Sequence, residues 1–317
     1  MKYYVGIDLG GTNVVSAVVG EDFKIRAKCS CKTNLPKSPK VLSDDIANLV
    51  HRTLKKSGLT MNDIQSIGVG IPGTINTRSK IIEYSCNFNY RNVHIAQMLG
   101  SRLKKPVYID NDANAAALGE FICGAGRGFH TIIVITLGTG VGGGVILNNK
   151  IYHGFNFNGG EIGHIVLKKG GRPCNCGRVG CFETYASATG IIRTAMEVMD
   201  EFRDSKMWDI YNKNHKINAK NVFDCAVSGD KAAKKVVEMF ISDLAAGLVN
   251  VVNIFQPQVL CVGGGVSMVG KLLIEPLQEI FDKEDYARHS RNRCKIISAK
   301  LGNDAGLIGA AMLFNFQ

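Results

Sequence analysis

The first third of the chain alternates apolar and polar positions in short runs. Three successive runs of β-branched or alternating residues predict a meander of strands at Tyr3 to Asp8, Val14 to Val19 and Lys24 to Ser30. Apolar residues from Val41 to Ser57 then recur at helical spacing, and Gly58 supplies a stop. A further strand, helix and strand are predicted at Ser66 to Ile71, Val93 to Leu103 and Val107 to Ile109. This pattern describes an α/β unit of about 110 residues.

A similar pattern starts again in the second half. A strand at Thr131 to Thr136, a glycine-rich turn at Gly138 to Gly140 and a strand at Val141 to Leu147 are analogous to the segment around Asp8 to Thr12. The similarity predicts a weak internal duplication. The remaining predicted elements are helices at Ser187 to Glu201, Lys231 to Phe255, Lys271 to Asp282 and Asp304 to Phe316, the last capped and apolar, and a strand at Val259 to Val262.

Length and composition favour a two-lobed globular protein. At 317 residues, 45% of them hydrophobic, the chain can bury a sizeable core, which excludes a disordered or fibrous class. We expect a first lobe at 1–112, with a C-terminal helix at 303–317 packing back on it, and a second lobe at 113–302. The apolar start ends at Asp8, unlike a signal peptide, and no uninterrupted apolar run reaches about 18 residues. We therefore expect a cytoplasmic protein with no membrane partner.

The net charge of +11 alone does not identify a partner. Lysines and arginines are dispersed, and no basic run exceeds a few residues. A nucleic-acid binder should also carry a recognisable module, and the sequence contains no zinc finger, aromatic RNA-binding signature or helix-turn-helix. We expect no nucleic-acid partner.

Three of the ten cysteines lie close together beside a histidine. His164 is followed by Cys174-x-Cys176-x-x-x-x-Cys181 in a glycine-rich, irregular segment. One imidazole and three thiolates suit tetrahedral Zn²⁺, and four protein ligands leave no position for a water, so the ion would be structural. The alternative is a set of free thiols beside an unrelated histidine. The other cysteines are interpreted as structural.

Two glycine-rich turns after apolar strands are candidates for binding phosphate. Backbone N–H groups without bulky side chains can approach phosphate oxygens, and Thr12, Thr136 and Thr139 could add hydroxyl donors. Each turn could instead be a simple tight hairpin. Formal matches to the dinucleotide and Walker fingerprints lack the required following helix or the required Ser or Thr, and we reject them.

Carboxylates at strand ends and beside the cysteines are candidates for substrate chemistry. Asp112 follows a predicted strand and leads into an alanine-rich helix, so it could be a general base or only a helix N-cap. Glu161 and Glu183 flank the predicted zinc segment and could bind sugar hydroxyls, or be only solvated surface charges.

Four motifs together resemble the ROK family, which contains bacterial glucokinases, related sugar kinases and sugar-responsive repressors. They are Asp8-Leu9-Gly10-Gly11-Thr12-Asn13, Asn111-Asp112-Ala113-Asn114, Gly159-Gly160-Glu161-Ile162-Gly163-His164 and Cys174-x-Cys176-Gly177-x-x-Gly180-Cys181-x-Glu183. The resemblance spans nearly the whole chain and implies the two-lobed actin-like (ribonuclease H-like) α/β fold, with sugar and ATP meeting in the cleft between the lobes.

The resemblance also implies a role for each motif. Asp112 would take a proton from the primary hydroxyl of the sugar, and Asp8 would help to position Mg²⁺ and ATP. The other sugar-binding residues would be Gly73, Asn87, Asn111, Glu161, His164 and Glu183. The residues around ATP would be Gly10, Gly11, Thr12, Asn13, Thr136, Gly138, Thr139, Gly140, Gly263, Gly264 and Gly265. His164 would use one ring nitrogen for zinc and the other for the sugar.

The resemblance favours a hexose kinase, with glucose as the leading substrate. The loops Pro72-Gly73-Thr74-Ile75 and Asn87-Phe88-Asn89-Tyr90 are similar to glucokinase loops, although tryptophan is more usual at the position of Tyr90. Alternatives are a kinase for fructose, allose, N-acetylmannosamine or N-acetylglucosamine, a catalytically silent sugar sensor, and a nonsugar ATPase. The family's repressors carry an N-terminal DNA-binding extension, whereas this chain reaches a strand at residue 3, which favours a kinase. A dimer or tetramer is implied.

Overall fold

The computed structural model describes all residues, 1–317, as two compact units. The first unit contains Met1–Val134, Gly144–Gly160 and Ala299–Gln317, and the second contains Ile135–Gly143 and Glu161–Ser298. The chain therefore passes between the units several times. The expected lobes, 1–112 and 113–302, have different limits from these units and stay a prediction about folding domains.

The first unit is built on a five-stranded sheet with the order β3-β2-β1-β4-β8. Its strands are β1 (Tyr3–Leu9), β2 (Asn13–Gly20), β3 (Ile25–Lys32), β4 (Ile64–Ile71) and β8 (Val107–Asn111). The first three strands pair antiparallel, as the sequence predicts for a meander, whereas β4 pairs parallel with both β1 and β8. The carboxyl ends of β1, β4 and β8 consequently lie at one edge of the sheet.

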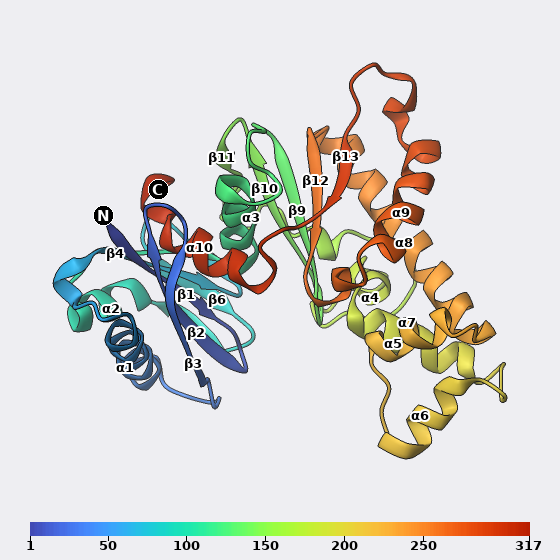
Figure 1. Cartoon of the computed structure of the whole chain (residues 1–317), viewed down its shortest axis with the longest axis horizontal. Coiled ribbons are helices and arrows are strands. Elements are labelled where there is room, and N and C mark those ends of the chain that lie inside the picture. Colours follow the sequence, from blue (N-terminus) through green and yellow to red (C-terminus); the bar gives the residue numbers. More distant parts are fainter. The chain divides into compact units, whose positions relative to one another are not determined.

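One face of this sheet is covered by α1 (Pro39–Ser57) and α2 (Ile95–Leu103) (Figure 1). The local sequence sets the limits of α1. Ser38 caps its start by accepting from the Val41 N–H, Pro39 suits the first helical position, and Gly58 ends it in the left-handed region at φ 72°. Its buried face packs on the odd-numbered apolar residues of β1, which include Val5 and Ile7.

The opposite face of the first sheet is covered by α10 (Ala305–Ala311), which packs beside α3 (Asp112–Cys123). Glycines permit this contact. A Cβ at Gly6 would lie 1.9 Å from the Leu307 carbonyl oxygen, and one at Gly68 would lie 1.7 Å from that of Ala310. The helix backbone therefore rests directly on the strands. The expected return of a C-terminal helix onto the first strands is observed within this unit.

The expected helix at Asp304 to Phe316 is shorter in the structure. The α-helix ends at Ala311, and Leu313–Asn315 form a 3₁₀ turn. Asp304 stands at the N-cap position without a side-chain capping bond, and its carboxylate accepts from Lys28 Nζ at 2.6 Å.

A small antiparallel sheet between β4 and α2 was not predicted. It consists of β5 (Thr74–Asn76), β6 (Ile81–Ser85) and β7 (Tyr90–Val93), paired in that order. These strands are three to five residues long, too short for an alternating pattern to stand out. The sheet carries the loops that contain Gly73 and Asn87.

A second five-stranded sheet repeats the strand order of the first, as β11-β10-β9-β12-β13. Its strands are β9 (Ile132–Leu137), β10 (Val141–Leu147), β11 (Lys150–Ile151), β12 (Val259–Gly263) and β13 (Lys295–Ser298). In each sheet the first strand of the set is central, and the next two strands along the chain lie on one side of it. This repetition supports the internal duplication predicted from the glycine-rich turns.

The second unit contains six helices, and the longest, α8, is central. They are α4 (Glu183–Ala186), α5 (Ala188–Met199), α6 (Lys206–Asn214), α7 (Ala219–Val227), α8 (Lys231–Phe255) and α9 (Lys271–Glu284). By length and composition alone α8 could cross a membrane, but half of its apolar window is buried in the protein, and it packs on α5, α7 and α9 (Figure 1). Asp243 within it pairs with Lys168 at 2.8 Å. The helix therefore has the packing of a core helix.

Candidate functional site

The turn after β8 brings the candidate base to the carboxyl edge of the first sheet. Gly70 of β4 is in register with Asp8 on one side and with Asp110 on the other. A Cβ at Gly70 would lie 3.4 Å from the Cα of Asp112 and 3.2 Å from the Cβ of Ala115. The absence of a side chain at Gly70 thus allows α3 to start directly above the strand ends.

Asn111, and not Asp112, is the N-cap of α3. The Asn111 side chain accepts from the Ala113 N–H at 2.8 Å and from the Asn114 N–H at 3.4 Å. Asp112 is the first helical residue and is partly exposed. The alternative that Asp112 serves only as the cap is therefore wrong, because that position is filled by its neighbour.

The carboxyl groups of Asp112 and Asp8 have raised pKa values. Burial raises the pKa of Asp112, against the opposing effect of hydrogen bonds from the backbone at Ala113 and Asp112. Burial, followed by repulsion from the charge of Asp112, raises the pKa of Asp8 to about 6. Two adjacent carboxylates of this kind suit a site that handles a proton and a divalent cation.

The first glycine-rich turn is hydrogen-bonded by Thr33, a residue that the sequence analysis did not identify. The Gly10 N–H donates to the Asn13 carbonyl at 3.0 Å, which closes the turn. The buried Thr33 donates its hydroxyl to the Gly10 carbonyl at 2.7 Å and its N–H to the Thr12 carbonyl at 2.9 Å. Because two carbonyls of the turn are engaged by one residue, its backbone conformation is fixed before any ligand arrives.

The predicted sugar-facing loops lie against this turn and against the strand end. A Cβ built on Gly11 would lie 3.5 Å from Nδ2 of Asn87. Asn111 Nδ2 donates to the Gly73 carbonyl at 3.1 Å. Gly73 has φ 125°, and a Cβ there would lie 2.3 Å from the Tyr84 carbonyl, so the position requires glycine. The first unit therefore gathers Asp8, Gly10, Gly11, Thr12, Asn13, Gly73, Asn87, Asn111 and Asp112.

In the second unit, the second glycine-rich turn contacts the triple glycine. Gly264 has φ 87°, and a Cβ there would lie 2.5 Å from the Leu137 carbonyl at the end of β9. The start of α5 holds the same turn, since the Ala188 N–H donates to the Gly138 carbonyl at 2.9 Å and the Thr189 hydroxyl to that of Thr139 at 2.8 Å. The segments Thr136 to Gly140 and Gly263 to Gly265 therefore pack directly against each other.

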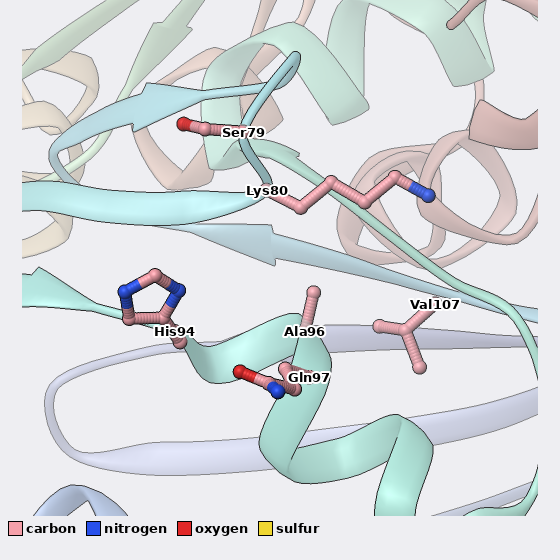
Figure 2. Close-up of a pocket in the computed structure, with 6 residues that line it drawn as sticks. All are labelled: Ser79, Lys80, His94, Ala96, Gln97 and Val107. Carbon is pink, nitrogen blue, oxygen red and sulfur yellow. The ribbon is translucent and has the colours of Figure 1, made fainter.

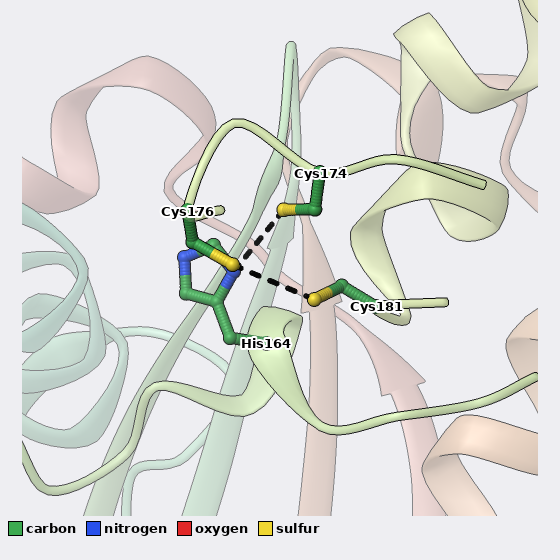
Figure 3. A group of neighbouring side chains, drawn as sticks. All are labelled: His164, Cys174, Cys176 and Cys181. Carbon is green, nitrogen blue, oxygen red and sulfur yellow. Dashed lines mark hydrogen bonds between the residues drawn. The ribbon is translucent and has the colours of Figure 1, made fainter. Parts of the chain in front are cut away.

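The four predicted metal ligands converge, as Figure 3 shows. Nδ1 or Nε2 of His164 and the Sγ atoms of Cys174, Cys176 and Cys181 all lie within 4.8 Å of one another. Cys176 Sγ is 3.6 Å from Cys181 Sγ, and Cys174 Sγ is 3.6 Å from His164 Nδ1. Ligands placed at about 2.0 to 2.3 Å from Zn²⁺ at tetrahedral corners are separated by roughly 3.5 to 3.8 Å. The side chains therefore have the chemistry of a four-coordinate zinc site, and these two distances match its spacing.

Both candidate glutamates border this cluster. Glu183 Oε1 is 3.1 Å from Cys174 Sγ and 3.7 Å from His164 Nδ1. A Cβ on Gly140 would lie 2.5 Å from the other Glu183 oxygen, so Glu183 also touches the second glycine-rich turn. Glu161 Oε2 lies 4.0 Å from His164 Nε2. His164 thus turns Nδ1 to the cysteines and Nε2 to Glu161.

A separate pocket of about 360 Å³ contains none of the predicted site residues (Figure 2). It is lined by Ser79, Lys80, His94, Ala96, Gln97 and Val107. Val107 begins β8 and Asn111 ends it, so the two ends of this strand are roughly 13 Å apart. The pocket therefore lies away from the turn that carries Asp112.

Sequence reasoning missed the residues that support the turn carrying Asp112. Asp110 lies in β8 and is 1% exposed, and His153 follows β11, yet His153 Nε2 is 2.7 Å from Asp110 Oδ2. Asp110 precedes Asn111 directly, and a carboxylate in an otherwise apolar strand was the signal that could have drawn attention to it.

Comparison with known proteins agrees with the fold. The sequence pattern of the ROK family matches residues 4–316. A glucokinase of Halalkalibacterium halodurans is 39% identical over 100% of this chain and 96% of its own length, and a glucokinase of Thermotoga maritima is 35% identical over 98% and 96%. A Streptomyces griseus ROK glucokinase, solved with glucose and AMPPNP, is 31% identical with a TM-score of 0.85 over 98% of both chains.

The repeated strand order and the solved relatives define the actin-like (ribonuclease H-like) α/β fold. The chain belongs to the ROK family. Repressors are also among its relatives, since a xylose repressor of Caldicellulosiruptor bescii is 28% identical over 96% of this chain and 76% of its own length.

Proposed function

We propose that the protein is an ATP-dependent hexose kinase that converts glucose to glucose 6-phosphate. The observation that carries the proposal is Asp112, a partly exposed carboxylate with a raised pKa at a strand end beside Asp8. The glucokinases at 39% and 35% identity, which match over nearly their whole length, support the choice of reaction and substrate.

In the proposed reaction Asp112 is the general base. Its carboxylate takes the proton of the 6-hydroxyl as that oxygen forms a bond to the γ-phosphorus of ATP. The bond from the γ-phosphorus to the β,γ-bridging oxygen breaks, and ADP leaves with the electron pair. A carboxylate whose pKa is raised accepts a proton more readily than an ordinary one, which favours this role.

The remaining groups bind and orient the substrates. Amide, imidazole and carboxylate groups of Gly73, Asn87, Asn111, Glu161, His164 and Glu183 are proposed to bind the sugar. The hydrogen bond from Asn111 to the Gly73 carbonyl supports grouping the residues of the first unit, and the proximity of Glu161 to His164 Nε2 supports grouping those of the second. Recognition by hydrogen bonds to hydroxyls gives strong discrimination between hexoses.

The two glycine-rich turns are proposed to hold ATP. Gly10 to Asn13 and Thr136 to Gly140 would surround the phosphates, and Gly263 to Gly265 would lie near the adenosine. Asp8 is proposed to position Mg²⁺, which neutralises phosphate charge when it is bound. The pKa of Asp8, about 6, allows it to be a carboxylate at neutral pH.

His164, Cys174, Cys176 and Cys181 are proposed to bind one structural Zn²⁺. Burial raises the pKa values of Cys174 and Cys181, so a cation is needed to hold these thiols as thiolates. Because all four ligands come from the protein, the site supplies rigidity and not a metal-bound nucleophile. The rigid segment would orient His164 Nε2 and Glu183 for the sugar.

The test is release of ADP from Mg-ATP by purified, zinc-replete protein. Glucose, mannose, fructose, allose, N-acetylglucosamine and N-acetylmannosamine are compared, each beside a control without sugar. We expect the highest kcat/KM with glucose and no ADP release without sugar. Preference for another hexose would support the kinase activity but rule out glucose as the main substrate. Hydrolysis of ATP without sugar would contradict both the kinase activity and the choice of glucose.

The second candidate function is a catalytically silent sugar sensor, which the xylose repressor relatives favour. Both functions require sugar binding, but only the kinase requires a general base. Sugar binding by calorimetry without any ADP release would support the sensor.

We also propose that the protein is a cytoplasmic dimer or tetramer that acts without a nucleic acid or a membrane. Sedimentation of the purified protein tests the oligomeric state. Binding assays with duplex DNA and with anionic vesicles at physiological salt test the absence of a nucleic-acid or membrane partner, and we expect no retention on either.

A further inference from the structure

The buried Asp110 carboxylate contacts several segments of the chain next to the turn that carries Asp112. Its Oδ1 accepts from the Asn111 N–H at 2.8 Å and from Asn114 Nδ2 at 2.9 Å. Its Oδ2 lies 2.7 Å from His153 Nε2 and 3.4 Å from Gln317 Nε2. Every donor comes from a different part of the first unit: the strand end, the helix, the segment after β11 and the C-terminal turn.

His153 is the close partner of Oδ2. A carboxylate buried to this extent must be hydrogen-bonded, because an unpaired buried charge is costly. Since an ionised carboxylate only accepts, Nε2 of His153 carries a hydrogen in this contact. Gln317 donates at the longer distance of 3.4 Å and also donates to the Ile109 carbonyl at 2.8 Å. Loss of the His153 side chain would therefore leave Oδ2 with one weak donor.

The residues tied to Asp110 bracket Asp112. Asn111 and Asn114 stand on either side of it, and both bond the same Asp110 oxygen. Asn111 in turn caps α3 and donates to the Gly73 carbonyl. A rotation of the Asp110 carboxylate would change both anchors at once and would move the Asp112 backbone between them.

The segment that carries His153 is itself held on the first unit. Asn158 Oδ1 accepts from the Thr74 hydroxyl at 2.5 Å, and Arg78 lies over the ring of Phe157 at 5.9 Å. The rings of His153 and Phe157 are 6.4 Å apart. These contacts give His153 a defined position, which a residue that orients another must have.

We propose that His153 is a positioning residue for phosphoryl transfer: by donating to Asp110 it holds the turn that carries the general base Asp112. This inference rests on the proposed function. His153 would not touch sugar or ATP, and its effect would be on the placement of Asp112 and hence on kcat. A displacement of about 1 Å in a reacting group can cost on the order of 100-fold in rate.

The test compares His153→Ala and His153→Gln with His51→Ala as a matched control. His51 lies on α1, is exposed and has no side-chain partner. We expect His153→Ala to lower kcat about 10- to 100-fold. The Kd for glucose should rise by a smaller factor, because Asn111, which is proposed to bind the sugar, is anchored to the same carboxylate. His153→Gln keeps an N–H donor and should restore most of kcat. Equal kcat in His153→Ala and wild type would overturn the inference.

A double-mutant cycle separates positioning from general loss of structure. If His153 acts through Asp112, then His153→Ala has little further effect on kcat in an Asp112→Asn background. Fully additive losses, or failure of His153→Gln to restore kcat in a folded protein, would contradict the inference.

Hydrogen exchange gives a readout that does not depend on turnover. His153→Ala should speed amide exchange in residues 107–118, and His51→Ala should not. If the wild type phosphorylates no hexose, the proposed function fails on that measurement. The inference itself fails when exchange in 107–118 is unchanged in His153→Ala.

Discussion

Asp112 and Asp8 share one edge of a sheet, but the proposed reaction needs them for different tasks. Asp112 needs a free carboxylate that can accept a proton, whereas Asp8 needs a carboxylate that can face a cation. Both have raised pKa values from burial, and the charge of Asp112 adds to the shift at Asp8. Substitutions at the two positions should consequently have different signatures.

Asp112→Asn should lower kcat by about 10²- to 10⁴-fold, the usual contribution of a general base. The amide keeps the size of the side chain, so the Kd for glucose should stay within about threefold. Asp204→Asn, an exposed carboxylate in the other unit, is the control and should leave kcat unchanged. ADP release and calorimetric titration give the two numbers, and near-normal turnover in Asp112→Asn would remove this residue as the base.

Asp8 should make the protein less stable as pH rises from about 4 to about 6. An unperturbed aspartate has a pKa of 3.8, and Asp8 in the folded protein has a pKa of about 6. Between these two values the folded state binds more protons than the unfolded state. Stability therefore falls with rising pH and levels off above pH 6. The full pKa shift corresponds to a loss of roughly 3 kcal/mol in the free energy of unfolding, and we expect a smaller loss because Asp8 is partly exposed to solvent.

Asp8→Asn should remove this dependence. Urea unfolding of both proteins at intervals from pH 4 to pH 7 isolates the effect as the difference between the two curves. Parallel curves would show that Asp8 has an ordinary pKa.

Residues that belong to a sequence motif could be predicted, but the distant residues that hold them in place could not. The glycines, Asp112 and the cysteines stand in compact patterns that the sequence displays. His153 lies 43 residues from Asp110, and Thr33 lies 23 residues from Gly10. Such pairs form only when distant strands meet, so no local spacing announces them.

The clearest packing constraint at the level of elements is the contact of α10 with the first sheet. Gly68→Ala places a methyl group where the Ala310 carbonyl oxygen now lies, at 1.7 Å, and neither backbone can yield easily. We expect a loss of about 3 kcal/mol or more in the free energy of unfolding, or failure to fold. Urea unfolding monitored by circular dichroism measures the loss.

Gly100→Ala is the matched control, because it lies within α2 and a Cβ there meets only ordinary contacts, the nearest at 3.5 Å. Replacing glycine by alanine in a helix interior is favourable by up to about 1 kcal/mol. We therefore expect this variant to be as stable as the wild type or more stable. Equal losses at Gly68 and Gly100 would contradict the packing described for α10.

Long elements were predicted well, and short ones were not. The limits of α8, Lys231–Phe255, agree with the sequence pattern, and the first three strands agree to within two residues. The strands β5 to β7 were missed because three to five residues cannot display a period, and α10 was expected too long because an apolar run does not reveal where Met312 leaves helical geometry. The hydrophobic pattern predicts the long segments that face the core, whereas turns and close backbone contacts determine the short strands and the helix ends.

At the scale of the molecule, the proposed zinc site should contribute to the stability of the second unit. We expect one Zn²⁺ per chain in the wild type and less than one in Cys176→Ser, with a fall in Tm of at least about 5 °C, since a structural metal contributes folding free energy. Cys86→Ser is the control, because Cys86 is exposed like Cys176 but lies outside the cluster. Metal analysis and thermal unfolding give both results, and full zinc content in Cys176→Ser would contradict the site.

The return of α10 to the first sheet also sets an order for biosynthesis. The ribosome releases the strands of the first unit early, but Leu307 and Ile308, which cover Tyr4 and Ala17, are released only after the whole of the second unit. Until then the residues of the first sheet that α10 buries are exposed, and a chaperone that binds exposed apolar strands has a defined target and a defined interval in which to act.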